Sequence, residues 1–157
     1  MDKLCHLYEF ATDNQIQIVN RSFSETKKAA CLHLKPAKYI VLDKAAISGK
    51  AEELAILSEE VGHYETGALY VIESTYNLPV ARSNRIKYEA QARNWAINNY
   101  CSPAEIERAA ELEKTADSGD GHAIAERCGV TVEFLCKAVE YHRTCGVEFS
   151  FDWETIG

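Results

Sequence analysis

Residues 50–67 constrain the fold most strongly, because they predict one long helix that carries three ionisable side chains close together. Ser48 is a suitable N-cap, and two glutamates follow in the first turn, where the helix dipole favours acids. Glu59 and His63 lie four residues apart, so their side chains are expected on one face of this helix. Glu60 lies beside them, about 100° around the helix.

The segments before this helix favour an α+β fold. Apolar residues recur at helical spacing near the N-terminus, and a polar–apolar alternation typical of a half-buried strand follows. Two more strand-like segments flank Pro36, so we expect a small antiparallel sheet between helices. The expected elements are a helix at 2–12 and strands at 15–19, 29–34 and 39–43.

The second half of the chain predicts helices only. A loop over 68–82 contains Pro79, and a strong helix follows from about 83 to 100. Ser102, Pro103 and Glu105 form a capping box with a first-turn proline, so another helix begins there and ends before the break at 117–121. Next come a helix, a glycine turn and a helix whose N-cap is Thr131, a helix-turn-helix pattern over 122–144. The predicted units are 1–101, 102–145 and a tail at 146–157, which is an edge strand or an extended arm.

Composition narrows the class of protein. The chain has 157 residues and a net charge of −7, with basic residues scattered along it, which argues against broad nucleic-acid binding. The second helix of the 122–144 unit leans acidic, so packing or a protein partner is favoured over DNA. The N-terminus lacks a signal-peptide pattern, and no apolar run approaches the length of a membrane span. We therefore expect a cytoplasmic protein whose six cysteines are free thiols.

Two helices together suggest a metal site. In metallopeptidases of the HExxH type, two ligands lie one helical turn apart, and a carboxylate between them reaches the metal-bound water. Here Glu59 stands in place of the first histidine. On the later helix Glu89 shares a face with Ala92 and Ala96, which indicates close packing with the acid directed into the contact. A buried carboxylate needs a partner, and a metal ion is one such partner.

These motifs resemble the ImmA/IrrE family of metallo-endopeptidases, which occur in phages and mobile elements. Residues 55–64 (AILSEEVGHY) are similar to the LAEELGHY helix of that family, and 39–43 are similar to the strand that precedes it. Residues 89–96 match its E-x-x-A-x-x-W-A helix, and 123–141 resemble its C-terminal unit. The resemblance covers roughly residues 1–145.

The resemblance implies a zincin-like metallopeptidase domain followed by a small helical unit. It implies that His63 and Glu89 are metal ligands, with Glu59 at the position of the third, and that Glu60 is the general base. The implied cofactor is a divalent metal, zinc first. The implied substrate is a repressor of the helix-turn-helix type.

Replacement of a histidine by Glu59 changes the expected chemistry of the metal. A Glu-Glu-His ligand set brings two negative charges, so the bound water deprotonates at higher pH and manganese or iron also becomes acceptable.

Three alternatives stay open at this stage. The acidic pair and His63 could form a solvated helix face, and Glu89 could pair with Arg93 at i, i+4. The chain could also be a catalytically inactive metallopeptidase-like module that binds a regulatory protein. A DNA-binding regulator that uses residues 122–144 is the third.

Overall fold

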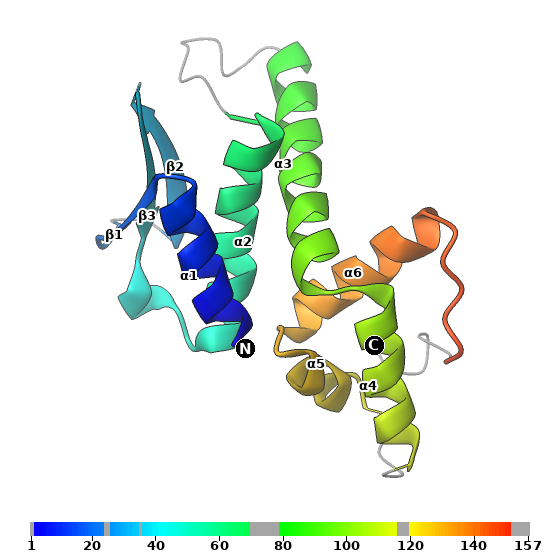
Figure 1. The fold of residues 1–157 in the computed structure, drawn as a ribbon. Coiled ribbons are helices and arrows are strands. Elements are labelled where there is room, and N and C mark those ends of the chain that lie inside the picture. The colour runs from blue at the N-terminus through cyan, green and yellow to red at the C-terminus, as the bar shows by residue number, and fades with distance from the viewer. Residues whose placement is uncertain (1, 24–25, 35, 70–78, 116–119, 152–157) are drawn as a thin grey trace.

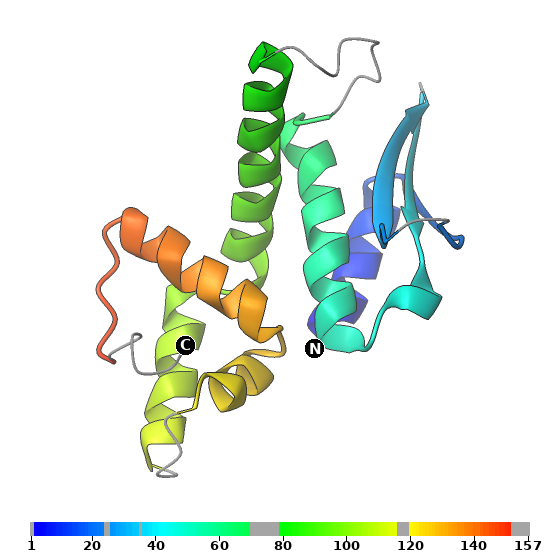
Figure 2. The same ribbon diagram turned by 180° about the vertical axis from the view of Figure 1, so that it is seen from behind.

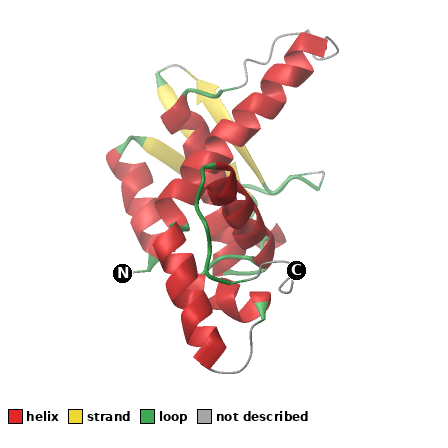
Figure 3. Cartoon of the chain, turned by 90° about the vertical axis from the view of Figure 1, so that its right-hand side faces the viewer, coloured by secondary structure: helices red, strands yellow, loops and turns green. Residues whose placement is uncertain are grey.

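A computed structural model describes residues 2–23, 26–34, 36–69, 79–115 and 120–151 of the chain (Figure 1). Most of the described elements are helices, and the strands of one small sheet follow α1 and precede α2 in the sequence (Figure 3). The elements are α1 (Lys3–Asp13), β1 (Ile16–Asn20), β2 (Ala29–Leu34), β3 (Ala37–Leu42), a short 3-10 helix η1 (Lys44–Ala46), α2 (Lys50–Thr66), α3 (Pro79–Tyr100), α4 (Pro103–Thr115), α5 (Gly121–Cys128) and α6 (Val132–Thr144).

The α+β class is confirmed, but the prediction of an antiparallel sheet is wrong in one respect. The strand order is β1-β3-β2, with β2 antiparallel to β3 and β1 parallel to β3. The sheet is therefore mixed.

The connection between β1 and β2 explains the parallel pairing. It crosses the end of β3, and Asp43 holds it there. The Asp43 backbone N–H donates to the Lys28 carbonyl at 2.8 Å, and its buried carboxylate accepts from the Phe23 N–H at 3.0 Å. This crossing places β2 beyond β3 and leaves β1 on the other side of β3, which is the reason the two outer strands are not neighbours.

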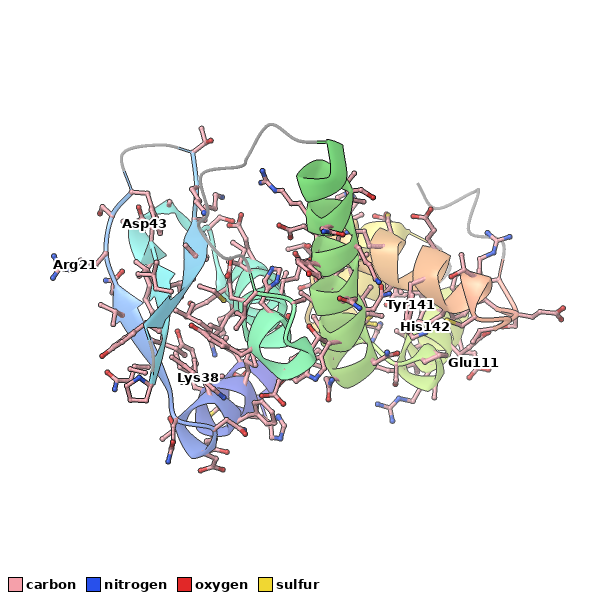
Figure 4. The ribbon with its side chains drawn as sticks, turned by 90° about the horizontal axis from the view of Figure 1, so that it is seen from above. Arg21, Lys38, Asp43, Glu111, Tyr141 and His142 are labelled. Atoms are coloured by element: carbon pink, nitrogen blue, oxygen red, sulfur yellow. The ribbon has the colours of Figure 1, made fainter. Side chains whose placement is uncertain are left out.

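The elements are arranged in layers around α2. Helices α1 and α2 pack on the sheet, and α3 runs antiparallel along α2 on the side away from it (Figures 1 and 2). Figure 4 shows α3 in the middle, with the sheet on one side and α6 on the other. One apolar core runs through these layers, with fully buried Leu7, Ile40, Leu57, Ile97 and Leu135. Helix α3 is thus covered by α2 along one flank and by α6 toward its C-terminal end, whereas residues 83–87 near its start are exposed.

Local capping signals account for most of the helix boundaries. The Thr131 side chain accepts from the Phe134 N–H at 3.1 Å and begins α6, as expected. Gly129 ends α5 in the left-handed conformation with φ of 68°. At the start of α2 the prediction is off by one residue, because the N-cap is Gly49. Ser48 instead donates through its N–H and its hydroxyl to the Glu52 carboxylate, at 2.7 Å each.

Helix α3 begins earlier than predicted. It begins at Pro79, four residues before the expected start at 83, because proline is well tolerated in the first helical turn. The part of the predicted loop at 70–78 lies outside the described residues, as does the end of the tail at 152–157. The described tail forms no strand, and its Phe149 and Phe151 pack against the core. No helix within the described ranges is long and apolar enough to cross a bilayer.

Candidate active site

The candidate site lies where α2 and α3 face each other. We call this contact the α2–α3 seam and define it by Glu59, Gly62 and His63 on α2 and Glu89, Ala92 and Arg93 on α3. The backbones of the two helices come close together at Gly62 and Ala92. A Cβ added at Gly62 would lie 2.4 Å from the Ala92 carbonyl oxygen, so only glycine allows the two backbones to come this close.

Ala92 and Ala96 are fully buried, which confirms the close packing that the alanine pattern predicted. The antiparallel helices place two side-chain pairs across the seam, one turn apart. His63 lies opposite Glu89, and Glu59 lies opposite Arg93.

His63 is held in a fixed orientation within the seam. Its side chain is only 6 % exposed, so the solvated-histidine alternative does not describe this residue. Its Nδ1 lies 2.8 Å from the Ala68 carbonyl oxygen, and a carbonyl can only accept, so we assign the proton to Nδ1. In the neutral ring Nε2 then carries the lone pair, and it lies 3.6 Å from Glu89 Oε2.

The surroundings of His63 change its proton affinity. Burial by itself lowers the pKa of His63. The Glu89 carboxylate and the Ala68 carbonyl raise the pKa by more than burial lowers it, and the Glu60 carboxylate adds to the increase. The ring is therefore in a negative field, which also attracts a metal cation.

The His63–Glu89 pair fits a metal ion. A separation of 3.6 Å is too long for a hydrogen bond. Two donors bound to one tetrahedral zinc at ~2.0–2.1 Å lie about 3.4 Å apart, close to the observed spacing. Anchoring of the other ring nitrogen by a carbonyl is also typical of metal-bound histidine. Among the described residues, the spacing of His63 and Glu89 is therefore compatible with two ligands of one divalent metal.

Glu59 has a different partner. Its Oε1 lies 3.3 Å from Arg93 Nε, and both side chains are about one third exposed, at 28 % and 33 %. Burial raises the pKa of the Glu59 carboxyl, and the positive charges of Arg93 and Lys137 offset this only in part. Across the described residues, no three His, Cys, Asp or Glu side chains are grouped closely enough to hold a metal ion. The three-ligand set of Glu59, His63 and Glu89 stays a prediction.

Glu60 lies on the sheet side of His63, next to a residue that the sequence did not single out. Cys31 on β2 donates its thiol to the Glu60 carbonyl at 3.0 Å. Burial raises the pKa of Cys31, and the Glu60 carboxylate raises it further, so the thiol stays protonated. This contact forms because β2 crosses α2 in the folded chain. The alternation of polar and apolar residues in the strand does not predict it. Glu60 is half-buried.

Tyr64 supports the site through the sheet. Its hydroxyl accepts from the Tyr39 N–H at 3.0 Å and lies 2.9 Å from the Leu32 carbonyl and 2.8 Å from that of Tyr39. Burial raises the pKa of Tyr64 to about 12. These contacts fix the end of α2 against β2 and β3.

No protein-family model matches this sequence, and neither the curated proteins nor the solved structures include one detectably similar to it. The family resemblance is therefore carried by the residue motifs alone.

Proposed function

We propose that this chain is a metal-dependent endopeptidase whose centre is built on His63 and Glu89, with Glu60 as the general base. The observation that carries this proposal is the buried His63 ring, anchored through Nδ1 and set 3.6 Å from the Glu89 carboxylate. The second support is the close approach at Gly62, which brings the two helices near enough for ligands from both.

The proposed chemistry assigns a task to each residue. A divalent metal bound at this pair would polarise the scissile carbonyl and lower the pKa of the attacking water. Glu60 takes a proton from that water and delivers it to the leaving amine, so no net proton is lost. In the described part of the chain β2 pairs with β3 alone, and its other edge can hold an extended peptide beside Glu60.

The proposed substrate is a regulatory protein of the helix-turn-helix repressor class, from a phage or mobile element. This choice follows the motif resemblance. It is supported by the mixed charge on α6, where exposed Glu133 and Glu140 accompany Arg143. Such a surface favours a protein partner over DNA. Zinc is the proposed metal, with manganese or iron as alternatives if Glu59 completes the site.

A non-catalytic binding module is the second candidate. The ion pair between Glu59 and Arg93 favours it, because this pair occupies the carboxylate that would be the third ligand. In that case the chain would bind the repressor and leave it intact.

Glu60→Gln separates the two candidates. Protein loaded with zinc is incubated with a helix-turn-helix repressor and, as a general probe, with unfolded casein. We expect cleavage by the wild type and at least about a 100-fold loss in the variant, because the base is removed while the metal ligands stay. Glu65→Gln, at an exposed position on the same helix, is the matched control and retains activity. Cleavage that survives Glu60→Gln refutes the peptidase proposal, and stable repressor binding by a wild type that never cleaves establishes the binding module.

A further inference from the structure

Two side-chain pairs, His63–Glu89 and Glu59–Arg93, face each other across the α2–α3 seam. Their spacing along the helices is the same, but their chemistry differs. Glu59 and His63 are four residues apart on α2, and Arg93 and Glu89 are four residues apart on α3. Because the helices are antiparallel, the two pairs lie side by side. One pair joins two metal-ligand side chains. The other joins a ligand-type side chain to a permanent cation, since arginine stays protonated in proteins.

The position of Arg93 matters for any cation bound at His63. The Glu59 carboxylate must turn toward His63 to act as a ligand, and its Oε1 lies 3.3 Å from Arg93 Nε. A guanidinium one helical turn from the pair also repels a divalent cation. Arg93 thus acts twice against metal binding, through the carboxylate that it holds and through its charge.

We propose that Arg93 and a divalent metal compete for the Glu59 carboxylate, so that Arg93 is a positioning residue that sets the metal affinity of the site. The inference rests on the proposed function, because it requires a metal at His63 and Glu89. With Arg93 paired, the metal has two protein ligands and is held weakly. When the pair opens, Glu59 becomes the third ligand and the affinity rises.

A double-mutant cycle with zinc alone as the probe tests this competition. Affinity is measured by calorimetric titration of the chelator-treated full chain, and thermal melting without metal reports folding. Arg93→Met is expected to bind zinc about tenfold more tightly than the wild type. Glu59→Gln in the wild-type background is expected to change affinity less than about threefold, because Glu59 is already engaged. The double variant should lose most of the gain and keep only the part that comes from removal of the positive charge, and this non-additivity is the mark of competition for one carboxylate.

Three controls make the cycle specific. Arg93→Lys keeps the charge and should bind zinc close to the wild-type affinity. Lys87→Met removes an exposed charge elsewhere on α3 and should have no effect beyond about twofold. His63→Gln should abolish binding in both the wild-type and the Arg93→Met backgrounds.

The possible outcomes separate the two proposals. If Arg93→Met binds zinc no more tightly than the wild type, and His63→Gln still abolishes binding, the competition proposal is overturned. The proposed function is then unaffected. A gain that persists undiminished in the double variant also overturns the competition proposal, because charge repulsion alone would then explain the whole effect. Zinc binding that does not depend on His63, or no binding by the wild type and Arg93→Met alike, overturns the proposed function and this inference with it.

Discussion

The α2–α3 seam and the α5–α6 unit show two different uses of helix packing. The seam places His63, Glu89, Glu59 and Arg93 at a helix contact and relies on Gly62 for the close approach. The α5–α6 unit buries apolar side chains and ends its helices with ordinary caps. Charged groups at a helix contact lower stability because they lose their hydration, whereas burial of apolar surface raises stability. We infer that both regions gain stability from apolar burial and that the ionisable pairs of the seam reduce this gain there.

The largest effect is expected in the apolar unit, at Leu135. This side chain is fully buried in α6, so Leu135→Ala should lower the free energy of unfolding by about 4 kcal/mol. Chemical denaturation measures the change. Glu140→Ala, exposed on the same helix, is the control and should stay within about 0.5 kcal/mol of the wild type. A small effect at Leu135 would break the comparison, because the unit would not depend on its core.

Gly62→Ala tests the seam in the same way. The new Cβ would meet three backbone atoms of Ala92, at 2.4 to 3.1 Å, so the helices must separate. We expect a loss of about 3 kcal/mol in unfolding free energy together with loss of zinc binding. Gly49→Ala is the control for an added Cβ, because a Cβ there meets nothing within 4 Å, and it should cost no more than the roughly 1 kcal/mol expected of alanine at the N-cap of α2. Wild-type stability of Gly62→Ala would show that the seam is looser than described.

Thr131→Ala sharpens the description of the α5–α6 unit. The side chain caps α6 by accepting from the Phe134 N–H at 3.1 Å, and its removal should cost about 1 kcal/mol. Thr131→Ser restores the acceptor and should recover most of the loss. If both variants are equally destabilised, the methyl group and not the cap is responsible.

The smallest effect is expected from pH, in metal-free protein. The pKa of His63 is raised in the folded state, so the native protein binds this proton more tightly than the unfolded chain does. The resulting stabilisation is fully present below the unfolded pKa of about 6.5 and is lost as the pH rises through the raised folded-state value. Denaturation between about pH 5.5 and 8.5, compared with His63→Gln, isolates this contribution. A wild type that gains stability over the variant as pH rises would contradict the assignment.

Features that depend on neighbouring residues followed from the sequence. The caps at Thr131 and at Ser102, the turn at Gly129 and the burial of Ala92 and Ala96 agree with the pattern. The caps and the turn each depend on a few neighbouring residues, whose backbone geometry and hydrogen-bonding groups are set locally, and the alanine burial follows from the helical spacing of small residues on one face.

Features that depend on contacts between distant segments could not be predicted from the sequence. The parallel pairing of β1 with β3 depends on how the intervening loop crosses Asp43, and strand alternation carries no information about it. Arg93 has two acids within reach, Glu89 on its own helix and Glu59 across the seam, and only the register of the two helices selects Glu59. The Cys31 thiol beside Glu60 is a third case.

The sequence by itself determined the helices, most of their caps and the one-turn spacing that puts Glu59 and His63 on the same face, because these depend on local backbone geometry. The tertiary structure alone decided which side chain each of them meets. The Gly62 contact sets the antiparallel register of α2 and α3, and that register gives His63 a carboxylate and Glu59 a guanidinium. Pairing across helices depends on where two backbones come closest, and that is a property of the packed molecule.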